Sequence, residues 1–210
     1  MLIPFRQVNQ FIQSNEKEIK GILHIGAHNC EEKDDYNTNG ISDDRIIWIE
    51  GNPDLVEKNK LKGVNIYHVL VDDEEKEVKF NITNNGQSSS ILELGTHKES
   101  YPHIFVSEQK QQKTMRLDTF FEQNNIDPSK YDFWNLDIQG TELRALKSAE
   151  KYLKYVNYIY TEVNTQEVYK GCALLPELDD YLAKHGFMRI GIKIVENAGW
   201  GDAFYYRVAT

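Results

Sequence analysis

Short apolar runs separated by polar segments recur along the whole chain, and their spacing distinguishes strands from helices. Apolar runs of about four to eight residues bounded by turn residues are typical of buried strands. Predicted strands lie at 22–26, 45–50, 64–71, 76–82, 112–116, 131–137, 155–162, 187–195 and 203–208. Apolar residues at helical spacing predict helices at 5–19, 54–59, 117–125, 142–151 and 174–185.

The order of these segments predicts the fold. Strands that alternate with helices over short connections are typical of a parallel sheet built from right-handed crossovers. The segment 196–202 is too short for a helix, so the last two strands are expected to form an antiparallel hairpin. We therefore predict a Rossmann-like α/β fold with helices on both faces of a mostly parallel sheet. Without an internal repeat or linker, 1–210 is expected to be a single domain, with 1–20 as a helical cover.

Charge and composition limit the classes of molecule that this chain is expected to bind. The chain has 24 Lys and Arg against 33 Asp and Glu, a net charge of -9, which argues against nucleic acid as a partner. The basic stretch 110–116 is interpreted as a solvated face. No apolar run is long enough for a membrane span. Cys30 and Cys172 are far apart, which favours reduced thiols and a cytoplasmic location. The oligomeric state is left open.

Two strand ends in the first half indicate a nucleotide-like ligand, because ligands of open α/β sheets bind at the carboxyl ends of strands. Gly26 follows the first strand, and Glu50 closes the second, where a carboxylate can accept both hydroxyls of a ribose. Asn29 and Cys30 stand where a dinucleotide loop would carry more glycines. This pattern favours S-adenosylmethionine (SAM) over NAD, although Gly26 also fits a purely geometric role.

Further acids close other strands. Asp72 is a candidate for the adenine amino group or part of a solvated turn, and Glu142 is expected to stabilise a helix N-terminus. A hydroxyl that accepts a methyl group must lose its proton, and Asp137, Glu162 and His28 are the candidate bases. Asp137 and Glu162 could also bind Mg²⁺, but no third ligand is evident, so a metal is possible but not expected.

Five ordered stretches resemble the FkbM family of SAM-dependent methyltransferases. They are HIGAH at 24–28, WIEGNP at 48–53, SSSIL at 88–92, RLDT at 116–119 and LDIQGTE at 136–142. The resemblance implies a class I methyltransferase fold and O-methylation of sugars or secondary metabolites. It also implies that Gly26, Ala27, Glu50 and Asp137 hold the family's cofactor positions. The cofactor-binding residues predicted for this chain are these four together with His28, Gly51, Asn52, Asp72 and Ser89. The Asn29-Cys30 pair departs from the family's glycine-containing continuation.

These observations favour a SAM-dependent O-methyltransferase whose acceptor is a hydroxyl of a sugar, glycan or small metabolite. Trp200, in a glycine-flanked loop, is a candidate for the acceptor pocket. Two alternatives stay open at this point. One is a catalytically idle Rossmann-like module that binds a glycan or a protein, and the other is a nucleotide-dependent oxidoreductase.

Overall fold

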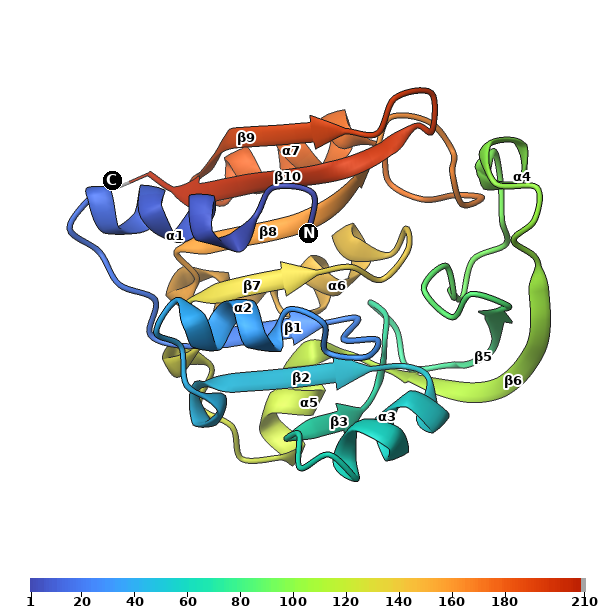
Figure 1. Cartoon of the computed structure of the whole chain (residues 1–210), viewed down its shortest axis with the longest axis horizontal. Coiled ribbons are helices and arrows are strands. Elements are labelled where there is room, and N and C mark those ends of the chain that lie inside the picture. Colours follow the sequence, from blue (N-terminus) through green and yellow to red (C-terminus); the bar gives the residue numbers. More distant parts are fainter. Residues whose placement is uncertain (209–210) are drawn as a thin grey trace.

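The computed structural model describes residues 1–208 and contains a seven-stranded sheet in the order β3-β2-β1-β7-β8-β10-β9 (Figure 1). The first five strands in this order are parallel, and β10 is antiparallel to β8 and β9. The strands are β1 Ile22–Ile25, β2 Ile46–Glu50, β3 Ile66–His68, β7 Phe133–Leu136, β8 Tyr158–Asn164, β9 Phe187–Ile194 and β10 Trp200–Arg207. The predicted parallel sheet with a terminal hairpin is confirmed.

Helices cover both faces of this sheet, as predicted. One face packs against α1 Phe5–Ser14, α2 Lys33–Thr38 and α3 Pro53–Lys60, which lie in front of the sheet in Figure 1. The opposite face packs against α5 Leu117–Gln123, α6 Glu142–Ser148 and α7 Leu175–Lys184. Short 3₁₀ helices occur at Asp43–Arg45, Pro128–Lys130 and Glu150–Tyr155.

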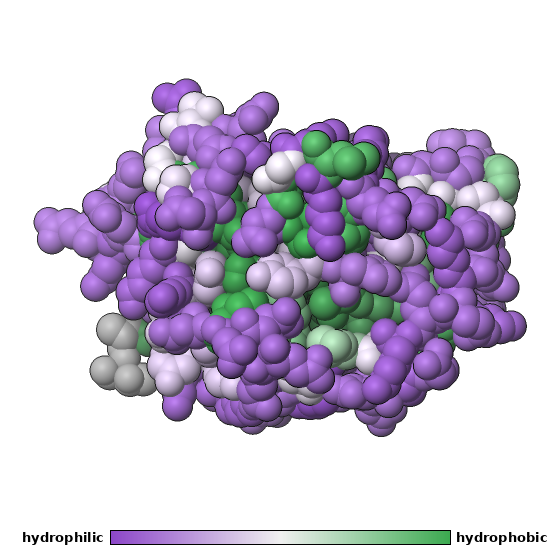
Figure 2. Space-filling view, turned by 90° about the horizontal axis from the view of Figure 1, so that it is seen from below, coloured by the Kyte–Doolittle hydropathy of each residue, from purple (hydrophilic) through white to green (hydrophobic). Residues whose placement is uncertain are grey.

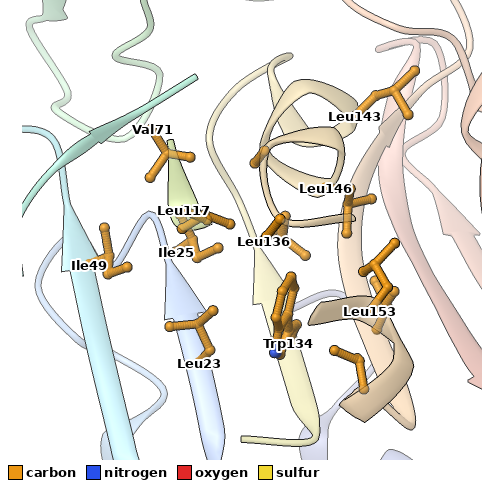
Figure 3. Packing of buried hydrophobic residues seen from close by; sticks show 14 of the residues in the cluster. Leu23, Ile25, Ile49, Val71, Leu117, Trp134, Leu136, Leu143, Leu146 and Leu153 are labelled. Atoms are coloured by element: carbon orange, nitrogen blue, oxygen red, sulfur yellow. The ribbon is translucent and has the colours of Figure 1, made fainter. Parts of the chain in front are cut away.

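The two faces hold two apolar clusters because side chains alternate along each strand. Leu23, Ile25 and Leu136 belong to one cluster with Leu117 of α5 and Leu146 of α6, and Figure 3 shows Ile25 beside Leu117. On the other face, Phe5 of α1 contacts the ring of Phe133 edge-on, with ring centroids 5.6 Å apart. Strands buried on both faces need apolar residues at every position, which explains the continuous apolar runs in the sequence.

A second, three-stranded sheet lies at the end toward which the parallel strands point (Figure 1). It has the order β4-β6-β5, and its strands are β4 Leu70–Val71, β5 Glu77–Thr83 and β6 Val106–Met115. The segment predicted as one strand at 64–71 is therefore two strands. β3 pairs with β2 in the main sheet, whereas β4 pairs with β6. A short helix, α4 His97–Ser100, follows β5.

Other expectations on secondary structure were wrong at their limits, and one helix was not predicted. The N-terminal helix ends at Ser14, although Ile19 beyond it is buried. The strand expected at 112–116 is the last part of the ten-residue β6. The polar segment after β1 contains α2, which buries only Tyr36. β6 and α2 carry few apolar residues, so periodicity gave little signal for them.

The side of the molecule near β3 and α3 is mostly hydrophilic, with hydrophobic residues visible in hollows between polar ones (Figure 2). Among residues 1–208, no helix has the length and apolar character needed to cross a membrane.

Candidate active site

A cavity of about 600 Å³ opens at the carboxyl ends of β1, β2, β7 and β8. Its other walls come from the loop 85–91, from α4 and the residues after it, and from the start of β10. Most of the residues proposed from the sequence line it, namely Gly26, Ala27, His28, Glu50, Gly51, Ser89, Asp137 and Glu162. Residues that are distant in sequence thus meet in one cavity because four strands end at the same edge.

Gly26 lies where the loops after β1 and β7 cross. Its φ is +88°, and a Cβ at this position would stand 1.7 Å from the carbonyl oxygen of Asp137. Its backbone N–H donates to the carbonyl of Ile49 at 2.9 Å. The glycine is therefore required by the approach of two backbones, whichever ligand the cavity binds.

Glu50 is buried, and backbone groups fix the direction of its carboxylate. Oε2 accepts from the N–H of His28 at 2.8 Å, and Oε1 accepts from the N–H of Asn52 at 2.7 Å. Burial raises the pKa of Glu50, and these two N–H groups oppose that shift. The carboxylate lines the cavity with its position set before any ligand binds.

His28 is held by a neighbouring acid on the same loop. Its Nδ1 lies 2.6 Å from Oε1 of Glu31, and its φ of 44° places the backbone in the left-handed region. Burial alone would lower the pKa of His28, but the hydrogen bond and charge of Glu31 raise it above its ordinary value. An imidazole that is more often protonated is less suited to act as a base.

The side chain of Gln139 connects the two strand-end acids. Its Nε2 donates to Oδ1 of Asp137 and to Oε2 of Glu162, both at 2.5 Å. Its Oε1 accepts from the hydroxyl of the buried Tyr169. Gln139 has a φ of 56°, which for a residue other than glycine is uncommon and is often found at ligand sites. The network holds both carboxylates in one orientation.

The two acids influence each other's ionisation. Asp137 can be reached from the cavity, yet burial among protein atoms and the charge of Asp202 raise its pKa to about 6. Burial, followed by the charges of Asp137 and Glu142, raises the pKa of Glu162 well above its ordinary value. Such close carboxylates hold one proton between them more readily than two negative charges.

Three of the acidic and polar residues noted in the sequence do not line the cavity. Asp72 is fully buried and forms an ion pair with Lys76 at 3.2 Å. Asn52 contributes its backbone N–H to Glu50, and its side chain caps α3 by accepting from the N–H of Asp54. Glu142 accepts from the N–H groups of Ile138 and Gly140, which fixes the turn after β7, in keeping with its expected structural role.

Several cavity residues were not proposed as site residues. Asp202, opposite Glu162 in the sheet, accepts from the hydroxyl of Tyr160. His97 is buried, with its Nε2 3.1 Å from Oγ of Ser88. Tyr101 accepts from Nε1 of Trp200 at 3.1 Å, and Trp200, the expected acceptor-pocket residue, lines the cavity. Among the described residues, no three His, Cys, Asp or Glu side chains are placed to hold a metal ion together.

The sheet order, the cavity at the strand ends and the oriented acid after β2 define the class as an α/β protein with a ligand site of the Rossmann type. The model of the methyltransferase FkbM domain matches residues 24–188. The chain therefore belongs to the FkbM methyltransferase family, is a methyltransferase by class, and has the class I methyltransferase fold. A search of curated proteins gave no match.

Solved structures of similar fold are only distantly related in sequence. Magnesium protoporphyrin IX methyltransferase from Synechocystis PCC 6803, solved with bound SAM, is 9% identical, with 97% of this chain and 77% of that chain covered and a TM-score of 0.49. Precorrin-6y C5,15-methyltransferase from Geobacter metallireducens GS-15 is 14% identical, with coverage of 99% and 91% and a TM-score of 0.49. An uncharacterized protein from Listeria monocytogenes serotype 4b is 11% identical, with coverage of 100% and 69% and a TM-score of 0.50.

Proposed function

We propose that this chain is a SAM-dependent O-methyltransferase whose acceptor is a hydroxyl of a sugar, glycan or small metabolite. The observation that carries the proposal is the oriented Glu50 carboxylate, which shares one cavity with the Asp137 and Glu162 pair in a chain of a methyltransferase family. A cytoplasmic location belongs to the proposal, because Cys30 and Cys172 are both free and buried.

The lining residues fit the parts of SAM. Glu50 would accept the ribose hydroxyls, since its backbone partners leave carboxylate lone pairs directed to the cavity. Leu70 and Phe80 line the same side and offer an apolar surface for adenine, whereas Asp72 is occupied by Lys76. Asp137, beside the Gly26 loop, would attract the positively charged amine of the methionine part.

The chemistry that SAM supplies is a methyl group on a positively charged sulfur, so the acceptor oxygen bonds to carbon while the electron pair of the C–S bond stays on sulfur. The protein must take the hydroxyl proton. We assign this to Glu162, which lines the cavity on the side of Trp200 and shares Gln139 with Asp137. The positive charge of the SAM sulfur would lower the pKa of the Asp137 and Glu162 pair, so the proton that these two carboxylates share would leave more easily.

Calorimetric titration with S-adenosylhomocysteine (SAH) tests the cofactor part. We expect micromolar binding to the wild type, about 30-fold weaker binding to Glu50→Gln from the loss of roughly 2 kcal/mol of charged hydrogen bonding, and none with NAD. Glu57→Gln, an exposed acid on α3, is the matched control and should bind as the wild type does. Glu162→Gln should keep SAH binding within a few-fold.

Absence of SAH binding to the wild type at millimolar concentration would contradict the proposal and favour a catalytically idle module. Binding of NAD in its place would favour the oxidoreductase. Methyl transfer itself is then measured with SAM against a panel of hydroxylated acceptors, and Glu162→Gln should lower the rate by about 100-fold or more, as expected for a lost general base.

A further inference from the structure

The cavity has a marked imbalance of charge. Its lining contains six carboxylates, which are Glu31, Glu32, Glu50, Asp137, Glu162 and Asp202. None of the lining residues is a lysine or an arginine. The basic side chains that do line the cavity are histidines only. A ligand with net negative charge would therefore find no lysine or arginine side chain to bind, and the N-terminal ammonium of Met1, which also lines the cavity, already lies 3.5 Å from Oε1 of Glu32.

Three of the four histidines that line the cavity, His24, His28 and His97, offer no free positive charge. Burial lowers the pKa of His24, and burial together with His103 lowers that of His97, so both are neutral near pH 7. His28 already holds Glu31 at 2.6 Å. The raised pKa values of Glu50, Asp137 and Glu162 reduce the negative charge but add no positive charge. The carboxylates of the lining therefore outnumber its positively charged groups, which disfavours a ligand with net negative charge.

Two lysines that do not line the cavity, Lys98 of α4 and Lys170, are compensated as well. The Nζ of Lys170 lies 2.7 Å from Oε2 of Glu93. The hydrogen bond and charge of Lys170, with the charge of Lys98, lower the pKa of Glu93. These lysines thus already face a carboxylate and do not supply the missing site for an anion.

The part of the cavity lined by Tyr101, Ile104 and Trp200 has a different character. Tyr101 and Trp200 come from segments about 100 residues apart, and the Trp200 indole N–H joins them by donating to the Tyr101 hydroxyl at 3.1 Å. Ile104 lines the cavity beside them. Behind them, His97 is 4% exposed and its Nδ1 has no hydrogen-bond partner within the protein. Aromatic rings with polar edges suit a ligand ring that is apolar on its face and polar at its rim.

We propose that Tyr101, Ile104 and Trp200 form the acceptor subsite and that this subsite takes an electrically neutral hydroxylated ring. Acceptors with a net negative charge, nucleotide sugars among them, are rejected by the carboxylates around the cavity, whereas the carboxylate of SAM or SAH is balanced by the ammonium group of the same molecule. This inference rests on the proposed function and specifies its substrate class. It also assigns a role to Tyr101 and Ile104, which neither the strand-end pattern nor the family positions indicate.

Tryptophan fluorescence gives a direct test, because Trp48 and Trp134 are buried in the core and Trp200 alone lines the cavity among the three tryptophans. The probes are 4-nitrophenyl β-D-glucopyranoside, which is neutral, and 4-nitrophenyl phosphate, which carries the same ring with an anionic group. Each is titrated at pH 8 with and without SAH, and Trp200→Phe supplies the background signal. We expect saturable quenching by the glucoside and at least tenfold weaker binding of the phosphate.

Two variants sharpen the test. Ile104→Lys places a positive charge on the same wall and should strengthen phosphate binding at least tenfold. Tyr101→Ala should weaken glucoside binding by a few-fold through the loss of an aromatic surface. Phosphate binding as tight as glucoside binding in the wild type, or no saturable quenching by the glucoside, would overturn the inference. A failure of SAH to bind counts instead against the proposed function, so the two failures are distinguishable.

Discussion

Gly26 shows how one residue sets the geometry of the site. A methyl group at this position would overlap the Asp137 carbonyl at 1.7 Å, and the φ of +88° disfavours any side chain. Gly26→Ala should therefore lower the free energy of unfolding by about 2–5 kcal/mol, from overpacking and backbone strain together. Gly40→Ala is the matched control, because Gly40 has a φ of +90° and no atom within 4 Å of the added methyl group.

Urea unfolding measures both variants, and Gly40→Ala should cost only about 1 kcal/mol from strain. Equal losses in the two variants would show that the close contact with Asp137 does not matter. In Gly26→Ala we also expect weaker SAH binding, since the loops after β1 and β7 must separate to admit the methyl group.

Glu142 gives a pH dependence that can be measured apart from activity. Burial raises its pKa to about 7, so the folded protein holds this proton more tightly than the unfolded chain. The stabilisation is complete below the ordinary pKa of about 4.5 and disappears as the pH rises through about 7. Glu142→Gln keeps a side-chain oxygen that can accept from the N–H groups of Ile138 and Gly140. As the pH rises over this range, its free energy of unfolding should fall less than that of the wild type, and the difference should be at most about 3 kcal/mol.

Denaturant unfolding between pH 4 and pH 8 gives this slope, with Glu57→Gln as an exposed control that should follow the wild type. A wild-type stability that increases steadily from pH 4.5 to pH 7 would contradict the prediction. Asp137 and Glu162 contribute in the same direction, because their pKa values are raised too.

The residues that the sequence indicated lie at strand ends, and this explains both what was found and what was missed. Gly26, Glu50 and Glu162 follow apolar runs, and all of them line the cavity. Asp72 also follows such a run, but its strand, β4, belongs to the second sheet, so its carboxylate meets Lys76 instead. His97 is the first residue of the short helix α4, which is positioned by distant backbone contacts, and it left no local pattern.

At the scale of elements, burial decides what could be predicted. β7 and β8 are buried on both faces and were evident as apolar runs. Most of β6 is exposed, and its ten residues are held by pairing with β5, a contact between segments that local periodicity does not encode. The same holds for α4, which lies beside Val168 because Gly95 donates to the Val168 carbonyl at 2.8 Å.

These poorly predicted elements close the cavity, and the well-predicted strands hold the acids. The residues after α4 include Tyr101 and Ile104. By contrast, Glu50 is the last residue of β2, Asp137 directly follows β7, and Glu162 lies in the last part of β8. The sequence therefore indicated the cofactor side of the cavity better than the acceptor side. Strand ends follow from hydrophobic periodicity, but the opposite wall depends on pairings between distant segments.

At the scale of the whole molecule, the cavity joins both sheets, so a ligand in it should stabilise the chain as one unit. Loop 85–91 lies against the end of β7, where Ser90 Oγ donates to the carbonyl of Gln139 at 2.8 Å. SAH at 100 times its dissociation constant should add about 2.7 kcal/mol and raise the midpoint of thermal unfolding by roughly 5–10 °C. NAD at the same concentration should leave the midpoint unchanged.

Far-ultraviolet circular dichroism and tryptophan fluorescence should give the same midpoint with and without SAH, because both then report one cooperative transition. A separate early transition that SAH does not move would show that the second sheet unfolds independently of the cavity. In that case the β4-β6-β5 sheet could not hold the acceptor wall against the strand ends, and ligand binding would have to order that wall.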